Sequence, residues 1–126
     1  MNSYLADTSF LSAFFNKGDV NYEKARDMVK DVRNEYMIIP SVVIAELSSF
    51  HMNSDFKELL IEESIGVASE VSSFGGHNIF SYLSFRRFYQ DNLKTIDSII
   101  LFTAIERGAK LLTFDKVLKK KYESIV

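Results

Sequence analysis

The sequence predicts an α/β fold, a three-layer α/β/α sandwich in which helices cover both faces of a parallel sheet. Short apolar runs, typical of strands buried on both sides, alternate with stretches of helical periodicity. That alternation is the usual signature of a parallel sheet with crossover helices. The length of 126 residues suits one domain. No internal repeat or linker divides the chain, so we expect a single domain over residues 1–126.

The first predicted strand and the first predicted helix are joined by a single aspartate. Residues 3–6 are a short apolar run, and Asp7 follows them directly. Residues 9–15 are almost entirely apolar, which predicts a buried helix with Thr8 or Ser9 as its N-cap. A carboxylate at the end of a central parallel strand lies where open α/β sheets bind their ligands.

The next part of the chain predicts three helices around a second strand. Residues 20–33 carry apolar side chains at helical spacing on one face and charged side chains on the other. Residues 36–39 form a continuous apolar run, which predicts a strand that ends at Pro40. Polar capping residues then open helices that we expect over residues 42–51 and 55–62.

The second half of the chain predicts three further strands and three further helices. Residues 65–67 predict a strand, although Gly66 lowers the preference for that structure. Gly108 ends a helix ahead of the strand at residues 110–114, as glycine commonly does. Residues 125–126 predict a truncated last strand. The helices predicted in this half are residues 78–90, 97–107 and 117–121.

Composition excludes several classes of protein. There are no cysteines, which excludes a disulfide scaffold and a thiolate metal site and fits a reducing cytosol. No apolar stretch approaches the roughly 20 residues that span a bilayer, and no signal-peptide pattern opens the chain. We therefore expect a cytoplasmic protein without a membrane anchor. The formal net charge of −2 gives no overall attraction to nucleic acid, so any such binding would need local basic patches or metal ions.

Four acidic residues are predicted to meet at one edge of the sheet. Asp7 and Asp115 each follow a strand directly. Asp97 lies at the start of a predicted helix, and Glu46 lies less than two turns into another. Strand C-termini and helix N-termini share one edge of a parallel α/β sheet, so the four carboxylates converge. Like charges raise one another's pKa, and hard Mg²⁺ or Mn²⁺ ions relieve that conflict with oxygen ligands. Such ions also assist the hydrolysis of phosphodiesters.

Each of these acids also has a simpler interpretation. Asp7, Asp97 and Asp115 could cap the helices that follow them, because acids favour helix N-termini. Glu46 could be a solvated position on its helix.

Four short motifs occur in order along the chain. They are Leu5-Ala6-Asp7-Thr8-Ser9, Pro40-Ser41-Val42-Val43-Ile44-Ala45-Glu46-Leu47, Ile96-Asp97-Ser98-Ile99-Ile100 and Leu111-Leu112-Thr113-Phe114-Asp115. In these motifs and their spacing, the chain resembles a PIN domain. Within that family it is similar to the small single-domain ribonucleases typified by VapC toxins. The resemblance covers essentially the whole chain.

The resemblance implies a strand order, a reaction and a set of roles. It implies a parallel sheet of order 3-2-1-4-5 and Mg²⁺- or Mn²⁺-dependent hydrolysis of phosphodiester bonds in single-stranded RNA. Asp115 would complete the metal site directly or through water. Ser9 and Thr113 match family hydroxyls that orient the acids. The catalytic and metal-binding acids that it implies are Asp7, Glu46, Asp97 and Asp115.

Basic and aromatic side chains are candidates for contacts with RNA or with a second subunit. The candidates for RNA contact are Lys94, Arg86, Arg87 and Lys116, with solvated helix faces as the alternative. The aromatic residues of 80–89 follow helical spacing, which favours a role in the core or in a dimer interface. We expect a homodimer. If the chain is the toxin of a toxin–antitoxin pair, an antitoxin protein is a further partner.

Other functions fit the sequence less well. A phosphatase of the haloacid dehalogenase type needs a second aspartate two residues after Asp7, where Ser9 stands. A receiver domain needs paired acids near the first strand. The alternatives that stay open are a degenerate, non-catalytic PIN-like binding module and a general RNA-processing nuclease outside a toxin–antitoxin pair.

Overall fold

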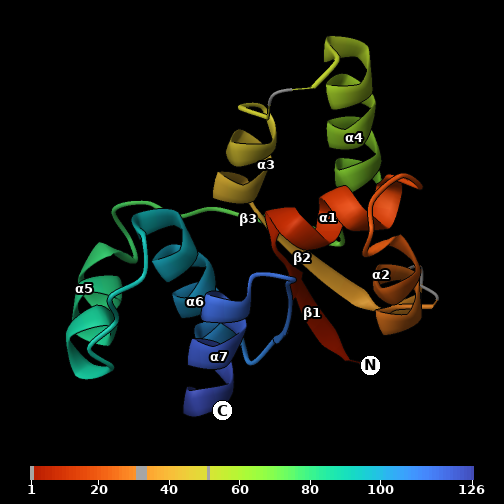
Figure 1. Ribbon diagram of the computed structural model, residues 1–126. Helices are drawn as coiled ribbons and strands as arrows, with labels where there is room; N and C mark the ends of the chain where they lie inside the picture. The colour runs from red at the N-terminus through yellow and green to blue at the C-terminus, as the bar shows by residue number, and fades with distance from the viewer. Residues whose placement is uncertain (1, 31–33, 51) are drawn as a thin grey trace.

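A four-stranded parallel sheet, covered by helices on both faces, forms the centre of the molecule (Figure 1). The computed structural model describes residues 2–30, 34–50 and 52–126. The strand order is β3-β2-β1-β4. This confirms the predicted α/β fold with a parallel sheet and the first four strands of the predicted order.

The strand β1 lies at the centre of the sheet and pairs in parallel with β2 and β4. Leu5 of β1 lies opposite Ile38 on one side and Leu111 on the other. Two crossovers therefore bring the first and last strands of the chain side by side. The strands are β1 (Ser3–Ala6), β2 (Tyr36–Pro40), β3 (Glu70–Ser72) and β4 (Lys110–Leu112).

Seven helices within the described residues surround this sheet. One face is covered by α1, α2 and α4, and the other by α6, with α5 on its outer side (Figure 1). The helix α7 packs beside α6 and reaches the core through Leu118. The helix α3 lies beyond the C-terminal ends of the strands (Figure 1). The helices are α1 (Thr8–Phe15), α2 (Tyr22–Met28), α3 (Ser41–Leu47), α4 (Ser54–Val67), α5 (Ile79–Phe88), α6 (Thr95–Arg107) and α7 (Lys116–Ile125).

The central strands are buried on both faces, which explains why their sequences are continuous apolar runs. Leu5 in β1 and Ile39 in β2 are completely buried. From α6, Ile100 and Leu101 pack into the same core. Burying a side chain of this size stabilises the fold by about 1.5–3 kcal/mol. The core therefore fixes β1, and with it the position of the residue that follows this strand.

The third strand lies later in the chain than the sequence predicts. The prediction of a strand at residues 65–67 is wrong, because α4 continues to Val67. Leu60 and Ser64 are both buried, at the spacing of four that a helix presents on one face. The strand is instead β3, whose Glu70 pairs with Ile38. Its polar residues suit an edge strand, where side chains reach solvent.

The predicted fifth strand is absent from the described residues. Residues 125–126 lie at the end of α7, so the sheet ends at β4 and the order 3-2-1-4-5 is wrong in its last member. Leu118 is fully buried, and the Tyr122 hydroxyl donates to the Ala109 carbonyl at 2.9 Å. Leu118 and Tyr122 are four residues apart. This spacing favours a helix that packs against the core, and not an extended strand.

The helix bounds also differ in detail from those predicted. The helix predicted over residues 20–33 is the shorter α2, and residues 31–33 lie outside the described part of the chain. The helix predicted over residues 42–51 is α3, which ends at Leu47; residue 51 likewise lies outside. Across the described residues, no helix is both long enough and apolar enough to span a membrane.

Candidate active site

Asp7 is held in place by hydrogen bonds of both its backbone and its side chain. Its backbone N–H donates to the Leu112 carbonyl at 3.0 Å, which continues the pairing of β1 with β4. Its carboxylate is buried and accepts hydrogen bonds from the Thr8 N–H at 2.7 Å, the Thr113 hydroxyl at 2.6 Å and the Ser9 hydroxyl at 3.1 Å. Asp7 itself is the N-cap of α1, so the predicted cap at Thr8 or Ser9 is wrong. Hydrogen bonds from three donors offset the cost of burying this charge.

Two hydroxyl groups connect the beginning of the chain to its end. The hydroxyls of Ser9 and Thr113 lie 3.2 Å apart, and both donate to Oδ2 of Asp7. The Ser9 hydroxyl also accepts from the Phe114 N–H at 2.9 Å, and that of Thr113 accepts from the Asp115 N–H at 3.0 Å. Ser9 and Thr113, which are more than 100 positions apart in the chain, thereby fix one carboxylate oxygen of Asp7.

Glu46 is held by a residue that the sequence analysis did not assign to the site. The hydroxyl of Thr8 donates to Oε1 of Glu46, which reaches it from α3. Thr8 is buried, and its backbone N–H donates a hydrogen bond to the Asp7 carboxylate. One residue thus contacts two of the four acids. The three consecutive polar residues after β1 were the available signal, but they resembled a helix cap.

Asp115 caps α7, as the simpler interpretation of its sequence predicted. Its Oδ1 accepts from the N–H groups of Val117 and Leu118, both at 3.0 Å. Its backbone continues from β4, so it lies at the same edge of the sheet as Asp7. The two capping bonds use one carboxylate oxygen only.

The charges of the other three acids affect the carboxyl group of Asp97. It lies in the first turn of α6, whose N-cap position is Lys94. Burial, followed by the charges of Asp7, Asp115 and Glu46 in that order of effect, raises the pKa of Asp97 to about 6. The charge of Lys94 acts in the opposite direction and lowers this pKa. Three carboxylates from separate parts of the chain therefore act electrostatically on Asp97.

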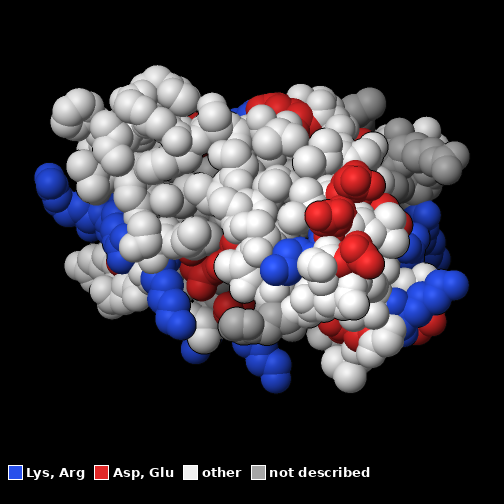
Figure 2. Space-filling model, turned by 90° about the horizontal axis from the view of Figure 1, so that it is seen from above, with Lys and Arg blue, Asp and Glu red and all other residues white. Residues whose placement is uncertain are grey.

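The chemistry of this donor set suits a hard divalent cation. All four charged groups are carboxylates, and the groups between them are hydroxyls, which together are the oxygen ligands that Mg²⁺ and Mn²⁺ prefer. Within the described chain, no Lys or Arg forms an ion pair with any of these acids. Figure 2 looks down on the C-terminal edge of the sheet and shows acidic atoms recessed near the middle of this face, with Lys and Arg side chains around them.

The four carboxylates lie near one another, but they are not arranged as a set of metal ligands. Among the residues that the structure describes, no three His, Cys, Asp or Glu side chains form a group that could hold a metal ion directly. Like charges repel at short range, so a counter-ion between them would favour closer approach. Each of Asp7, Glu46 and Asp115 is meanwhile held by hydrogen bonds from its own neighbours.

The predicted basic candidates fall into two groups. Lys94 and Lys116 are exposed, and each lies beside the site in the chain, three residues before Asp97 and directly after Asp115. Arg87 is exposed in the last turn of α5. Arg86 lies in the same turn.

Arg86 is engaged within the protein. Its guanidinium donates to the Tyr82 hydroxyl at 2.8 Å, the Leu93 carbonyl at 2.8 Å and the Asp91 carbonyl at 3.3 Å. The buried carboxylate of Asp91 accepts from the Ser98 hydroxyl at 2.6 Å and the Leu93 N–H at 2.8 Å. This network attaches the segment between α5 and α6 to the first turn of α6. No pattern in the sequence predicts this network.

Comparison with known proteins places this architecture in a family. The PIN domain family model matches residues 4–124. The structure of VapBC2 from Rickettsia felis, bound to a DNA fragment from their promoter, is similar with a TM-score of 0.68 at 19% identity, over 94% of this chain and 92% of that chain. Mycobacterium tuberculosis VapC20, described as a Sarcin-Ricin loop cleaving toxin, is similar with a TM-score of 0.69 at 14% identity, over 93% of each chain.

At these identities the two structures share the fold with this chain. No curated protein matched the sequence. The family model, by contrast, covers almost every residue, including all four acids at the sheet edge. The chain therefore belongs to the PIN domain family.

Proposed function

We propose that the protein is a Mg²⁺- or Mn²⁺-dependent endoribonuclease that hydrolyses phosphodiester bonds of single-stranded RNA. The observation that carries the proposal is that four acids lie at one edge of the sheet, where burial and then the charges of Asp7, Asp115 and Glu46 raise the pKa of Asp97. A carboxylate whose pKa is shifted by burial and by neighbouring charges is a recognised mark of a functional site. Membership of the PIN domain family supports the same chemistry.

Asp7, Glu46, Asp97 and Asp115 would hold the cation. When bound, it would neutralise their mutual repulsion and the charge that develops on the phosphodiester, and would make a water more acidic. The chain's own hydroxyls keep the carboxylates in place. Thr8 orients Glu46, while Ser9 and Thr113 orient Asp7. Such supporting contacts commonly change metal affinity or activity by 10–100-fold when lost.

The reaction is a hydrolysis in which one bond to phosphorus replaces another. The oxygen of a water forms a bond to phosphorus, and the bond from phosphorus to the 3′ oxygen of the ribose breaks. The leaving oxygen takes up a proton. The products are one fragment with a 5′-phosphate and one with a 3′-hydroxyl.

The biological setting that we propose is a toxin–antitoxin pair in the cytoplasm. Both similar structures contain VapC-type proteins, one of them in a VapBC complex with promoter DNA and the other a toxin that cleaves the sarcin–ricin loop. An antitoxin protein is accordingly a proposed partner, and single-stranded or structured RNA the proposed substrate. A general RNA-processing nuclease would use the same acids without the antitoxin. A non-catalytic module would have no need to keep all four.

A cleavage assay tests the proposed activity. The wild-type protein is incubated with end-labelled single-stranded RNA in Mn²⁺, with EDTA as the parallel condition. We expect cleavage in Mn²⁺ alone, and its loss in Asp7→Asn. Asp27→Asn, which removes an exposed acid from α2, is the matched control and should cleave like the wild type. Cleavage that persists in EDTA or in Asp7→Asn would refute the proposal.

A further inference from the structure

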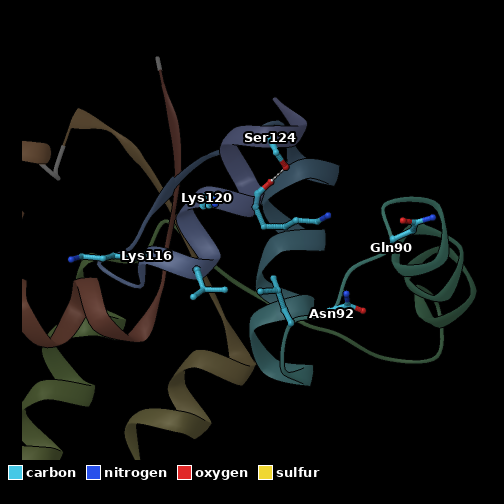
Figure 3. Close-up of a pocket in the computed structure, with 8 residues that line it drawn as sticks. Gln90, Asn92, Lys116, Lys120 and Ser124 are labelled. Atoms are coloured by element: carbon cyan, nitrogen blue, oxygen red, sulfur yellow. Dashed lines mark hydrogen bonds between the residues drawn. The ribbon is translucent and has the colours of Figure 1, made fainter.

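A cavity of about 550 Å³ lies between α7 and the segment that joins α5 to α6 (Figure 3). Gln90, Asn92 and Leu93 line it from the joining segment. Lysines and Val117 line it from α7. In Figure 3, Gln90 and Asn92 lie across the cavity from Lys120 and Ser124. The cavity thus has two walls that are far apart in sequence.

Both walls are held in place by contacts within the protein. Arg86 donates to the carbonyls of Asp91 and Leu93, and the buried Asp91 side chain accepts from the Leu93 N–H. Across the cavity, the Lys121 ammonium donates to the Tyr89 carbonyl at 2.7 Å. This last bond joins α7 to the end of α5. The cavity is therefore a built feature of the fold.

Both walls of the cavity are close in sequence to acids of the candidate active site. Lys116 lines it and directly follows Asp115. On the other wall, Leu93 lies four residues before Asp97. In Figure 3 the Lys116 side chain extends away from Gln90 and Asn92, towards the side on which β1 and α1 lie. The end of the cavity at Lys116 is therefore the end that lies next to Asp115 in the chain.

The chemistry of the lining matches a nucleotide. Leu93 and Val117 offer apolar surface for the face of a base. The side-chain amides of Gln90 and Asn92 each carry a donor and an acceptor, as the edge of a base requires. Lys116 and the other lysines on α7 supply positive charge for phosphates, and the lining residues include no acid. An acidic peptide would satisfy the lysines but would not need the paired amides beside the apolar surface.

We propose that this cavity is an RNA subsite that holds one nucleotide beside the phosphodiester that the acids cleave. The proposal rests on the proposed ribonuclease function, because it names where the substrate of that site binds. It goes beyond the ribonuclease function because it assigns RNA contact to Gln90, Asn92 and Lys120. It can be tested by binding alone, without cleavage.

The test compares two neighbouring lysines on one helix. Lys120 lines the cavity, whereas Lys119 is exposed on α7 and does not. Lys120→Glu and Lys119→Glu change the net charge equally, so the general field of the protein is the same in both. Binding of fluorescent single-stranded RNA is measured by anisotropy in EDTA at several salt concentrations. We expect Lys120→Glu to weaken binding about tenfold and to lower the salt slope by about 1. Lys119→Glu should weaken binding about twofold at most.

A second pair of variants tests the apolar and amide surfaces. Val117 is largely exposed, so Val117→Asp should fold normally while it places a carboxylate in the cavity. Asn92→Ala removes one amide and leaves the charge unchanged. We expect both to weaken RNA binding, and Asn92→Ala to reduce the preference among homopolymeric RNAs. Circular dichroism confirms that each variant is folded.

The outcomes separate this proposal from the proposed function. Equal effects of Lys119→Glu and Lys120→Glu would overturn the subsite, even if Mn²⁺-dependent cleavage persists. Absence of RNA binding by the wild type would also overturn it. Poly-glutamate binding that is sensitive to Lys120→Glu, with no RNA binding, would assign the cavity to an acidic peptide instead. Weakened RNA binding in Lys120→Glu alone supports the subsite, whether or not the wild type cleaves.

Discussion

At the scale of single residues, the charge of Asp97 is unfavourable in the folded, metal-free site. Its carboxyl has a pKa of about 6 in the folded chain, against 3.8 for an ordinary aspartate. Between these values the folded state binds more protons than the unfolded state. The free energy of unfolding therefore falls as the pH rises through this window.

Removal of that charge should stabilise the metal-free protein. In EDTA at pH 7.5, we expect Asp97→Asn to raise the free energy of unfolding by about 1 kcal/mol, a figure reduced for solvent screening of a partly exposed group. Below about pH 4 the gain should disappear, because the wild-type carboxyl is then protonated in both states. Urea denaturation at the two pH values measures this, with Asp27→Asn as the control. A loss of stability at pH 7.5 would contradict the raised pKa of Asp97.

Thr8 provides a test of how the acids are oriented. Thr8→Val keeps the shape of the side chain but removes the hydroxyl that donates to Glu46. We expect cleavage to slow, or Mn²⁺ to bind more weakly, by about 10-fold or more. Thr8→Ser retains the hydroxyl and should restore most of the activity. If Thr8→Val matches the wild type in both rate and Mn²⁺ affinity, the bond to Glu46 has no role in the site.

The sequence allowed the acids to be named but not all of the groups that hold them. Asp7 and Asp115 could be proposed because each follows a strand, Asp97 because it begins a helix, and Glu46 because it lies in the helix after the second strand. The contact of Thr8 with Glu46 joins residues 38 positions apart, and no local pattern reveals such a pair. The cavity between α7 and the residues around Asn92 could not be predicted for the same reason. Its two walls come together only in the folded chain.

At the scale of elements, the edge strand β3 is held by an ion pair. Arg107 at the end of α6 donates two hydrogen bonds to the Glu70 carboxylate, at 2.6 and 2.7 Å, and the Tyr36 hydroxyl donates a third at 2.8 Å. The bonds from Arg107, followed by that from Tyr36, lower the pKa of Glu70 to about 2. These contacts connect β3 to β2 and to α6.

Loss of this ion pair should destabilise the fold modestly and in a pH-dependent way. At pH 7 we expect Glu70→Gln to lower the free energy of unfolding by about 0.5–1 kcal/mol, as for a partly exposed bidentate pair. The folded pKa lies below the usual value of 4.5. The difference from the wild type should thus be complete above about pH 4.5 and fade as the pH falls towards 2. Chemical denaturation across this range measures it.

Glu106→Gln is the matched control for this prediction, because Glu106 neighbours Arg107 on α6 and is exposed. It should leave stability almost unchanged. Equal effects of the two substitutions would mean that general charge, and not the pair with Arg107, stabilises the edge of the sheet.

The elements that the sequence predicted well are those whose burial dictates their pattern. β1, β2 and α6 are buried and were recognised from apolar runs. β3 was misplaced because it is a polar edge strand, whereas the apolar residues before it belong to the end of α4. The end of α7 was taken for a strand because two apolar residues carry no helical period by themselves.

At the scale of the whole molecule, the topology of the sheet creates the site. The crossovers that place β1 between β2 and β4 bring Asp7 beside the residues that follow β4. The same arrangement directs the N-termini of α3 and α6 to that edge. The exposed apolar side chains of α5 are a separate feature at this scale, and include Phe80 and Phe88, at 80% and 78% exposure.

We expect these aromatic residues to lie in the interface of a homodimer. A double variant, Phe80→Glu with Phe88→Glu, should elute as a monomer in size-exclusion chromatography with light scattering, because apolar surface of this kind drives association. Val20→Glu alters an equally exposed apolar residue outside α5 and should leave the dimer intact. A wild-type protein that is monomeric at every concentration would contradict the expectation.

The most direct test of the central claim, that four acids at one sheet edge hold a divalent cation, is a Mn²⁺ titration of the wild-type protein by isothermal calorimetry. We predict saturable binding that Asp7→Asn and Asp97→Asn each abolish, while Asp27→Asn binds like the wild type. Binding that does not saturate, or that survives both substitutions at the site, would contradict the account.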